Sequence, residues 1–278
     1  MNDLLKRVGV AILGIPLILF LIYKGGVFFL VFILFVNALA LWEFYTIHHG
    51  KGIFPFRKSA LAASSLALCG FFAFPNLAEV WLILPLFLIF PAQLRTPRGS
   101  GSLNLVYTIA GMVYIPLFLA LLLHLRLNFD VFLPQVDAPT AGGLFVITMI
   151  ISLWLCDTGA YFGGKTLGRH KLAPNVSPNK TIEGTVTGFL AAVAGFWLLG
   201  SWLLPGVPQS FTLWAGVLVG SVGQIGDLIE SRFKRDAGVK DTSALLPGHG
   251  GILDRFDSLI FISPVIWGLC YLAQWQIF

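Results

Sequence analysis

The stretch GGVFFLVFILFVNALALWEFYTI, from Gly25 to Ile47, contains no charged residue before Glu43. An apolar run of about 20 residues is long enough to cross the hydrocarbon core of a bilayer as a helix. Eight further apolar runs occur. Two of them, residues 59–75 and 77–91, are short and separated only by Asn76, so that we expect a helical hairpin or a partly re-entrant pair there. These eight runs cover residues 8–23, 59–75, 77–91, 105–125, 142–162, 184–204, 211–230 and 259–278. The sequence therefore predicts an all-α, polytopic integral membrane protein with about nine transmembrane helices.

The composition excludes a soluble protein. Of the 278 residues, 57% are hydrophobic and only 11% are charged, and the mean hydropathy is +0.85, whereas soluble domains carry about 25% charged residues. The three cysteines are scattered through apolar segments without a CxxC pair, which indicates packing residues rather than metal ligands. We expect one membrane domain over residues 1–278, with residues 1–140 mainly a transmembrane scaffold and residues 141–278 a catalytic half.

The distribution of Lys and Arg predicts the orientation, since these residues concentrate in cytoplasmic loops. With nine spans and the N-terminus inside, every Lys and Arg except Lys24 and Arg126 falls on the cytoplasmic side. The N-terminus and the polar clusters described next are therefore expected to be cytoplasmic. The net charge of +5 then follows from topology, and no nucleic-acid partner is expected.

The N-terminal half has few acids. Glu43 stands late in the opening stretch, within LWEFYTIHHGK from Leu41 to Lys51, near the expected membrane interface. Trp42, Tyr45 and His48 look like part of an interfacial belt. We interpret Glu43 as belonging to an ordinary anchored helix end.

The first polar cluster of the C-terminal half is LWLCDTGAYFGGKTLGRHK, from Leu153 to Lys171. Asp157 lies in an apolar run, and an acid inside a membrane is costly enough to count as a functional candidate. Tyr161 shares its helix face. The alternative is a structural Asp bound by its neighbours. The glycines of this cluster allow either close helix packing or close approach of the backbone to a ligand.

The second cluster is SPNKTIEGTVTG, from Ser177 to Gly188. It is typical of a loop that enters a helix N-terminus, where Thr181 caps the helix. The free N–H groups and the dipole at such an end favour anions, and Lys180 adds a full positive charge. The sequence thus indicates a phosphate site, although a topogenic Lys beside an ordinary cap would give the same pattern.

The third cluster begins with GQIGDLIESRFKRD, from Gly223 to Asp236. If the preceding span continues as a helix, Asp227, Glu230, Ser231 and Lys234 lie at positions i, i+3, i+4 and i+7 on one face. The segment that follows contains too many helix breakers to stay helical.

The last span is then preceded by ILDRFDS, in which Asp254, Asp257 and Ser258 share a face of a starting helix. Two helices thus each bring acids to the same membrane border. Carboxylates and hydroxyls are ligands for hard cations such as Mg²⁺, which commonly binds through one or two carboxylates and substrate phosphates. Together with nearby Lys and Arg, they indicate a phosphoryl- or nucleotidyl-transfer site.

The segment SRFKRDAGVKDTSALLPGHGGILDRFD, from Ser231 to Asp257, resembles the signature of the phosphatidate cytidylyltransferases, or CDP-diacylglycerol synthases. The first and second clusters resemble this family as well, so that the resemblance covers about residues 154–257. The positions of the signature that match are Ser231, Lys234, Arg235, Lys240, Asp241, Pro247, Gly248, His249, Gly250, Gly251, Asp254, Arg255 and Asp257.

The resemblance implies an integral membrane enzyme that condenses CTP with phosphatidic acid to CDP-diacylglycerol and pyrophosphate in phospholipid biosynthesis. It also implies Mg²⁺, a second cation such as K⁺, a homodimer among membrane lipids, and location in a bacterial inner membrane. The family's metal-binding acids map onto Asp227 and Asp254, and Asp257 is a further candidate ligand. The expected catalytic residues are Asp227, Asp254, Lys234 and His249, where His249 either protonates the leaving pyrophosphate or only braces the glycine turn. The expected substrate-binding residues are Lys180, Ser177, Ser231, Arg235, Lys240, Arg255, Asp157 and Glu183.

Two other functions remain open from the sequence. A related CTP-dependent kinase would transfer the γ-phosphate to a polyprenol or another lipid. An ion-coupled transporter would use Asp157, Asp227 and Asp254 as a cation path, but the chain shows no internal repeat of the kind common in transporters.

Overall fold

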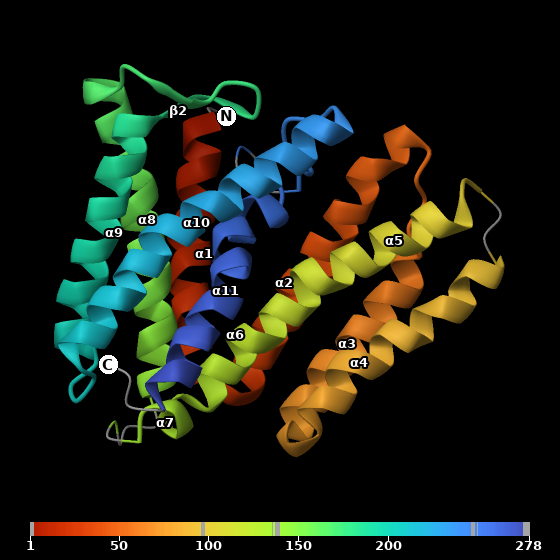
Figure 1. The fold of residues 1–278 in the computed structure, drawn as a ribbon, viewed down its shortest axis with the longest axis horizontal. Helices are drawn as coiled ribbons and strands as arrows, with labels where there is room; N and C mark the ends of the chain where they lie inside the picture. The colour runs from red at the N-terminus through yellow and green to blue at the C-terminus, as the bar shows by residue number, and fades with distance from the viewer. Residues whose placement is uncertain are drawn as a thin grey trace. The chain divides into compact units, whose positions relative to one another are not determined.

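Helices dominate the computed structural model, which describes residues 3–95, 98–134, 136, 140–245, 248 and 250–274 (Figure 1). The prediction of an all-α polytopic protein is confirmed. The elements are α1 (Asp3–Lys24), α2 (Gly26–Ile47), η1 (His48–Lys51), α3 (Arg57–Ala73), η2 (Pro75–Leu77), α4 (Ala78–Ile89), η3 (Phe90–Arg95), α5 (Gly101–Met112), η4 (Val113–Leu117), α6 (Phe118–Leu127), α7 (Phe129–Phe132), α8 (Ala141–Leu167), β1 (Lys171–Ala173), β2 (Ser177–Thr181), α9 (Ile182–Leu203), α10 (Gln209–Ala237) and α11 (Leu253–Ala273).

Each of the nine predicted runs falls on a helical segment. Among the described residues, seven segments are long and apolar enough to cross a membrane. The two remaining runs fall on shorter apolar helices. The first run corresponds to Ala11–Lys24 of α1, and the third corresponds to α3, which has 17 residues. The seven segments are Gly26–Lys51, Pro75–Ala92, Gly101–Leu127, Ala141–Leu167, Ile182–Leu203, Gln209–Ala237 and Leu253–Ala273.

The chain forms two compact units that interleave along the sequence. Unit 1 comprises residues 1–21, 26–123 and 233–256, and unit 2 comprises residues 22–25, 124–232 and 257–278. Boundaries between the units fall inside α1, α6, α10 and α11, which each contribute residues to both units. The prediction of a scaffold half and a catalytic half concerns function, and this division does not test it.

In unit 1, α2 is fixed by polar contacts on two sides. The buried Tyr45 hydroxyl donates to the carbonyl oxygen of Thr108 on α5 at 2.7 Å, and Gly111 leaves room for the Tyr45 ring. On the other side, the Asn37 amide donates to the Ser64 hydroxyl of α3 at 2.9 Å. Because buried polar groups are costly unless they are hydrogen-bonded, these contacts set the position of α2 within its unit.

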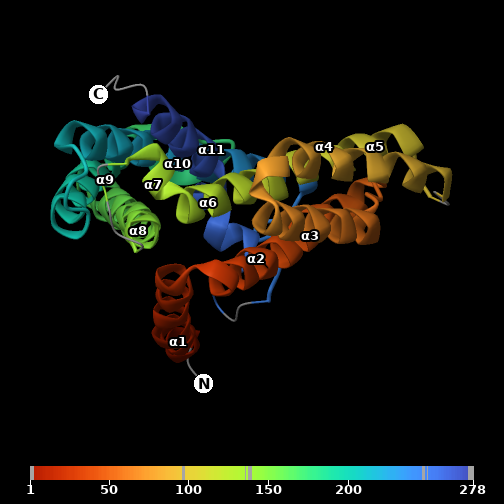
Figure 2. The ribbon, with the colours of Figure 1, turned by 90° about the horizontal axis from the view of Figure 1, so that it is seen from below.

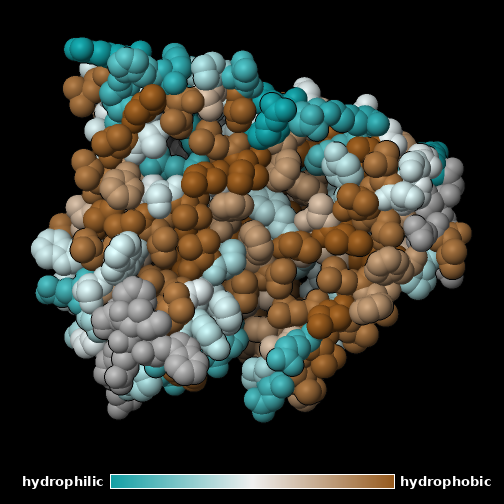
Figure 3. Space-filling model, viewed as in Figure 1, coloured by the Kyte–Doolittle hydropathy of each residue, from teal (hydrophilic) through white to brown (hydrophobic). Residues whose placement is uncertain are grey.

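The short third and fourth runs form a helical hairpin. α3 and α4 lie side by side in unit 1 (Figure 2), and Gly70 accommodates the ring of Trp81. The other side of α4 exposes apolar side chains such as Val80, Ile83 and Phe87, in the region where Figure 3 shows hydrophobic side chains over this helix. An apolar exposed face of this kind is typical of a surface in contact with lipid.

Unit 2 is built around the close pair α8 and α9, with glycines where the helices meet. A Cβ atom on Gly188 of α9 would lie 2.7 Å from the carbonyl oxygen of Cys156 and 2.9 Å from the Cβ atom of Ala160, both on α8. On α8, Gly163 gives room to Thr187 in the same way. Gly163 of the first cluster therefore serves close helix packing, one of the two roles that the sequence allowed.

We expect Gly188→Ala to destabilise the protein by about 1–3 kcal/mol, because the added methyl group meets backbone that cannot move aside. Gly268→Ala is the matched control, since Gly268 is also in a helix of unit 2 and has nothing within 4 Å of the added Cβ atom. There the gain in helix propensity should leave stability unchanged or raise it by up to about 1 kcal/mol. Thermal unfolding in detergent measures both, and equal shifts of Tm would contradict the packing role.

Between α8 and α9 the chain forms a two-stranded antiparallel hairpin, β1 and β2. The sequence predicted an irregular loop for the second cluster, but Ser177 to Thr181 pair with Lys171 to Ala173 as a strand. The predicted cap is confirmed, because the Thr181 side chain accepts a hydrogen bond from the Gly184 N–H at the start of α9. The hairpin lies at the end of unit 2 where α8 ends and α9 begins (Figure 1).

Candidate active site

Glycines on α10 let two helices of unit 2 approach its backbone. A Cβ atom on Gly220 would lie 3.0 Å from the carbonyl oxygen of Phe189 on α9, and one on Gly226 would lie 2.6 Å from the Cβ atom of Phe261 on α11. The residue after Gly226 is Asp227. The close approach of α11 therefore occurs where the acids of the third cluster begin.

Three carboxylates lie together on these two helices. Asp227 and Glu230 of α10 and Asp257 of α11 each place one oxygen so that the three atoms are within 4.8 Å of one another. Glu230 and Asp257 are buried, with 1% and 8% of their surfaces exposed. The sequence placed Glu230 on the same face as Asp227 but did not count it as a metal ligand. Oxygen ligands of this kind suit Mg²⁺.

The hairpin of β1 and β2 places a positively charged lysine side chain beside this cluster. Lys180 of β2 forms an ion pair with Asp227, its ammonium nitrogen 2.5 Å from Oδ2, and Lys180 and Asp227 are both partly exposed. The Ser231 hydroxyl donates to the other oxygen of Asp227 at 3.3 Å, as their i, i+4 spacing on α10 allows. Lys180, Ser231 and Asp227, predicted as site residues, thus lie together in unit 2.

Other predicted residues of unit 2 are not members of this group of three carboxylates. The Glu183 carboxylate accepts hydrogen bonds from the backbone N–H groups of Arg169 and His170, so that it orders the turn before β1. Ser177 begins β2 and pairs with Ala173. Asp157 is exposed on α8 and does not belong to the group of three carboxylates found among the described residues.

In unit 1, a glycine turn ends α10. Gly238 has a φ of 77°, its N–H donates to the carbonyl of Arg235, and the N–H of Val239 donates to the carbonyl of Lys234. This pattern is a Schellman cap, in which glycine adopts the left-handed conformation at no steric cost. The Arg235 guanidinium also donates to the carbonyl of Val239 at 2.9 Å. The helix does continue past Lys234, which the shared face of the third cluster required, and the prediction that the glycine-rich segment is not helical is confirmed where α10 ends at Ala237.

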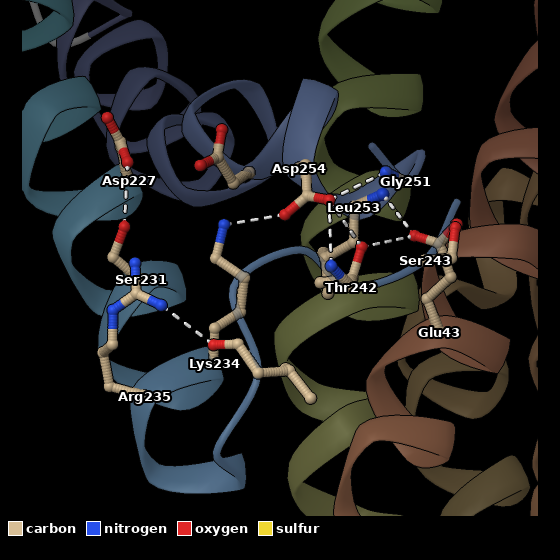
Figure 4. Close-up of polar contacts among 12 residues, drawn as sticks. Glu43, Asp227, Ser231, Lys234, Arg235, Thr242, Ser243, Gly251, Leu253 and Asp254 are labelled. Carbon is tan, nitrogen blue, oxygen red and sulfur yellow. Dashed lines mark hydrogen bonds and ion pairs between the residues drawn. The ribbon is translucent and has the colours of Figure 1, made fainter. Parts of the chain in front are cut away.

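Asp254, in the first turn of α11, is surrounded by donors of unit 1 (Figure 4). Its Oδ1 accepts from the Lys234 ammonium at 2.7 Å. Its Oδ2 accepts from the backbone N–H groups of Thr242 at 3.0 Å and Gly251 at 2.7 Å, and lies 3.0 Å from the Thr242 hydroxyl. The side chains of Lys234 and Asp254 are 11% and 4% exposed. Two predicted catalytic residues therefore form a mostly buried ion pair.

Glu43 corrects our interpretation of the N-terminal half. It is not an anchored helix end at an interface, because only 3% of its surface is exposed. Its carboxylate accepts four hydrogen bonds from residues between 242 and 253, where the chain leads into the first residue of α11 (Figure 4). The donors are the hydroxyls of Thr242 at 2.9 Å and Ser243 at 2.7 Å and the backbone N–H groups of Ile252 at 3.0 Å and Leu253 at 2.8 Å. No local pattern signals these partners, since they stand 199 to 210 positions away.

Three further predicted phosphate-binding residues of unit 1, Arg235, Lys240 and Arg255, are exposed. Guanidinium and ammonium groups carry several N–H donors, which suit the oxygens of a phosphate. His249 and the neighbouring Pro247 lie outside the described residues.

The chain belongs to the cytidylyltransferase family, whose model matches residues 5–273. It is similar to the phosphatidate cytidylyltransferase of Synechocystis sp., with 35% identity over 94% of each chain. The phosphatidate cytidylyltransferase of Staphylococcus epidermidis is 32% identical over 92% of this chain and 95% of its own. With the Staphylococcus aureus enzyme of that name the identity is 44% over 47% of this chain and 50% of the relative.

Proposed function

We propose that this protein is a phosphatidate cytidylyltransferase, which joins CTP and phosphatidic acid to give CDP-diacylglycerol and pyrophosphate. The observation that carries the proposal is the similarity to enzymes of that name along almost the whole of both chains. The chemistry of the described residues agrees with it, because carboxylates beside a Lys suit a reaction between phosphates.

In the proposed reaction, a phosphate oxygen of phosphatidic acid forms a bond to the α-phosphorus of CTP. The bond from that phosphorus to the bridging oxygen of the β-phosphate breaks, and its electron pair leaves with pyrophosphate. A phosphate monoester has a second pKa near about 6 and is largely dianionic at neutral pH. The nucleophile therefore needs no strong general base, which agrees with a site of carboxylates and cations.

The residues of the carboxylate cluster fit a magnesium ion. Asp227, Glu230 and Asp257 would hold it, and a bound Mg²⁺ supplies positive charge for the phosphate oxygens and the leaving group. Lys180 has three N–H donors, so that one would stay on Asp227 while another would meet a phosphate oxygen. We also propose Asp254 as a metal ligand, as the resemblance to the family implies, and a second cation such as K⁺.

Arg235, Lys240 and Arg255 are the proposed partners of the triphosphate and of the lipid phosphate. CTP is water-soluble and phosphatidic acid stays in the leaflet, so that the reaction belongs at a membrane border. We further propose that the protein lies in a bacterial inner membrane with the site and the N-terminus cytoplasmic, and that it forms a homodimer.

Labelled CTP tests the proposed function. Purified protein in detergent with phosphatidic acid and Mg²⁺ should transfer the label of α-labelled CTP to CDP-diacylglycerol and release the γ-label in pyrophosphate. EDTA should abolish the product, because the phosphate charges are then left without the metal ion. A lipid kinase would instead carry the γ-label to the lipid and leave the α-label in CDP, and that result would contradict the proposal.

A further inference from the structure

Glu43 is a buried carboxylate that takes no direct part in the proposed reaction. Taking a charge out of water is costly unless it is well hydrogen-bonded. The four donors from the segment between residues 242 and 253 meet this need at 2.7 to 3.0 Å. The same contacts bind α2, where Glu43 stands, to a segment far along the chain.

Two of the donors belong to the beginning of α11. The N–H groups of Ile252 and Leu253 lie at the helix N-terminus, where the first N–H groups have no partner within the helix. A negative charge at this end is also favoured by the helix dipole. Glu43 therefore caps α11 from a different helix. It sets the point at which α11 begins and thereby the position of Asp254 in the first turn.

Thr242 connects Glu43 with Asp254. Its hydroxyl oxygen lies 2.9 Å from Oε2 of Glu43 and 3.0 Å from Oδ2 of Asp254, and its backbone N–H donates to the same Asp254 oxygen. A hydroxyl carries a single proton, so that the two carboxylates compete for one donor and their positions depend on each other. Ser243 instead donates to the other oxygen of Glu43.

We propose that Glu43 is a positioning residue for cytidylyl transfer. It holds Thr242 and the N-terminus of α11, and through them it fixes the carboxylate of Asp254 opposite Lys234. This inference rests on the proposed function, because Asp254 and Lys234 are placed in the machinery of that reaction. It concerns a residue that the sequence pattern assigned to an ordinary helix end.

A matched pair of hydroxyl deletions tests the path through Thr242. Thr242→Val and Ser243→Ala each remove one hydrogen bond to Glu43, but only Thr242→Val also removes the contact with Asp254. We expect Thr242→Val to lower kcat about tenfold with a smaller change in KM, since misplacing a reacting group acts on the transition state. Thr242→Ser, which keeps the hydroxyl, should restore the rate, and Ser243→Ala should keep kcat near that of the wild type.

Glu43→Gln tests the clamp without reference to activity. An amide offers one acceptor oxygen, so that one of the two backbone N–H groups at the start of α11 loses its partner. Hydrogen–deuterium exchange of residues 242–253 should become about tenfold faster or more. Glu79→Gln is the control, because Glu79 is an exposed residue of α4 in the same unit.

The outcomes separate the inference from the proposed function. The positioning role would be overturned by equal losses of kcat in Thr242→Val and Ser243→Ala. It would also be overturned if Glu43→Gln shows faster exchange with unchanged kcat. In both cases, product formation by the wild type still supports the proposed function. If the wild type forms no CDP-diacylglycerol, the proposed function fails, and the positioning role of Glu43 in that reaction fails with it. Faster exchange in Glu43→Gln would then show only a structural role for Glu43. If Glu43→Gln does not fold, the two hydroxyl deletions decide.

Discussion

Asp227→Asn should lower the rate of CDP-diacylglycerol formation about a thousandfold or more. The substitution keeps the size of the side chain but replaces one of the three carboxylates of the cluster with a neutral amide. A metal ion contributes several kcal/mol of charge stabilisation to such a reaction, and about 1.4 kcal/mol corresponds to a factor of ten in rate. Turnover with labelled CTP measures the loss.

A second measurement distinguishes a lost metal site from a lost fold. Binding of Mn²⁺, followed by electron paramagnetic resonance, should weaken in Asp227→Asn while Tm stays close to that of the wild type. Asp130→Asn is the control, since Asp130 is an exposed acid of the same unit. If Asp227→Asn keeps Mn²⁺ affinity and a rate near that of the wild type, our metal assignment is wrong.

The helices were predictable because their signals are local. Each apolar run falls on a helix, and the Thr181 cap follows from residues within three positions of one another. The end of α10 follows in the same way from Gly238, whose left-handed conformation few other residues adopt without strain. Periodicity also predicted that Asp227 and Ser231 share a face, as their hydrogen bond requires.

The contacts that build the site were less predictable, because they join positions far apart in the chain. The strand β2 exists only through its pairing with β1, and its own residues are typical of a loop that enters a helix. Lys180 meets Asp227 across 47 positions. Glu230 was visible as a neighbour of Asp227 on α10, but its proximity to Asp257 depends on how closely α11 packs at Gly226.

Glu43 shows the limit of the sequence most clearly. A single acid near the end of an apolar run has the same local pattern whether it meets solvent or lies buried against a distant loop. Burial and four donors distinguish the two cases, and both are tertiary properties. The sequence does predict that such an acid needs partners, because burying a charge without hydrogen bonds is costly. An acid within a predicted span therefore needs donors from somewhere else in the fold.

The second large effect is expected at the ion pair of Lys234 and Asp254. Its side chains are 11% and 4% exposed, and removal of one partner from a buried pair typically costs about 3–5 kcal/mol, because the other charge stays buried. Lys234→Met should therefore lower Tm strongly and abolish turnover. The sequence predicted Asp254 as a catalytic residue and metal ligand, whereas the hydrogen bonds from Thr242 and Gly251 give it a structural role as well.

Unit 1 offers a matched control for this prediction. Lys51 and Asp236 form a second Lys–Asp pair at 2.9 Å, with side chains 40% and 47% exposed. Exposed pairs contribute about 0–1 kcal/mol, because water screens the charges and holds either partner alone. Lys51→Met should thus leave Tm and turnover close to the wild-type values, as measured by thermal unfolding in detergent and by the labelled-CTP assay. Equal losses of Tm in Lys51→Met and Lys234→Met would show that burial does not set the importance of the Lys234 pair.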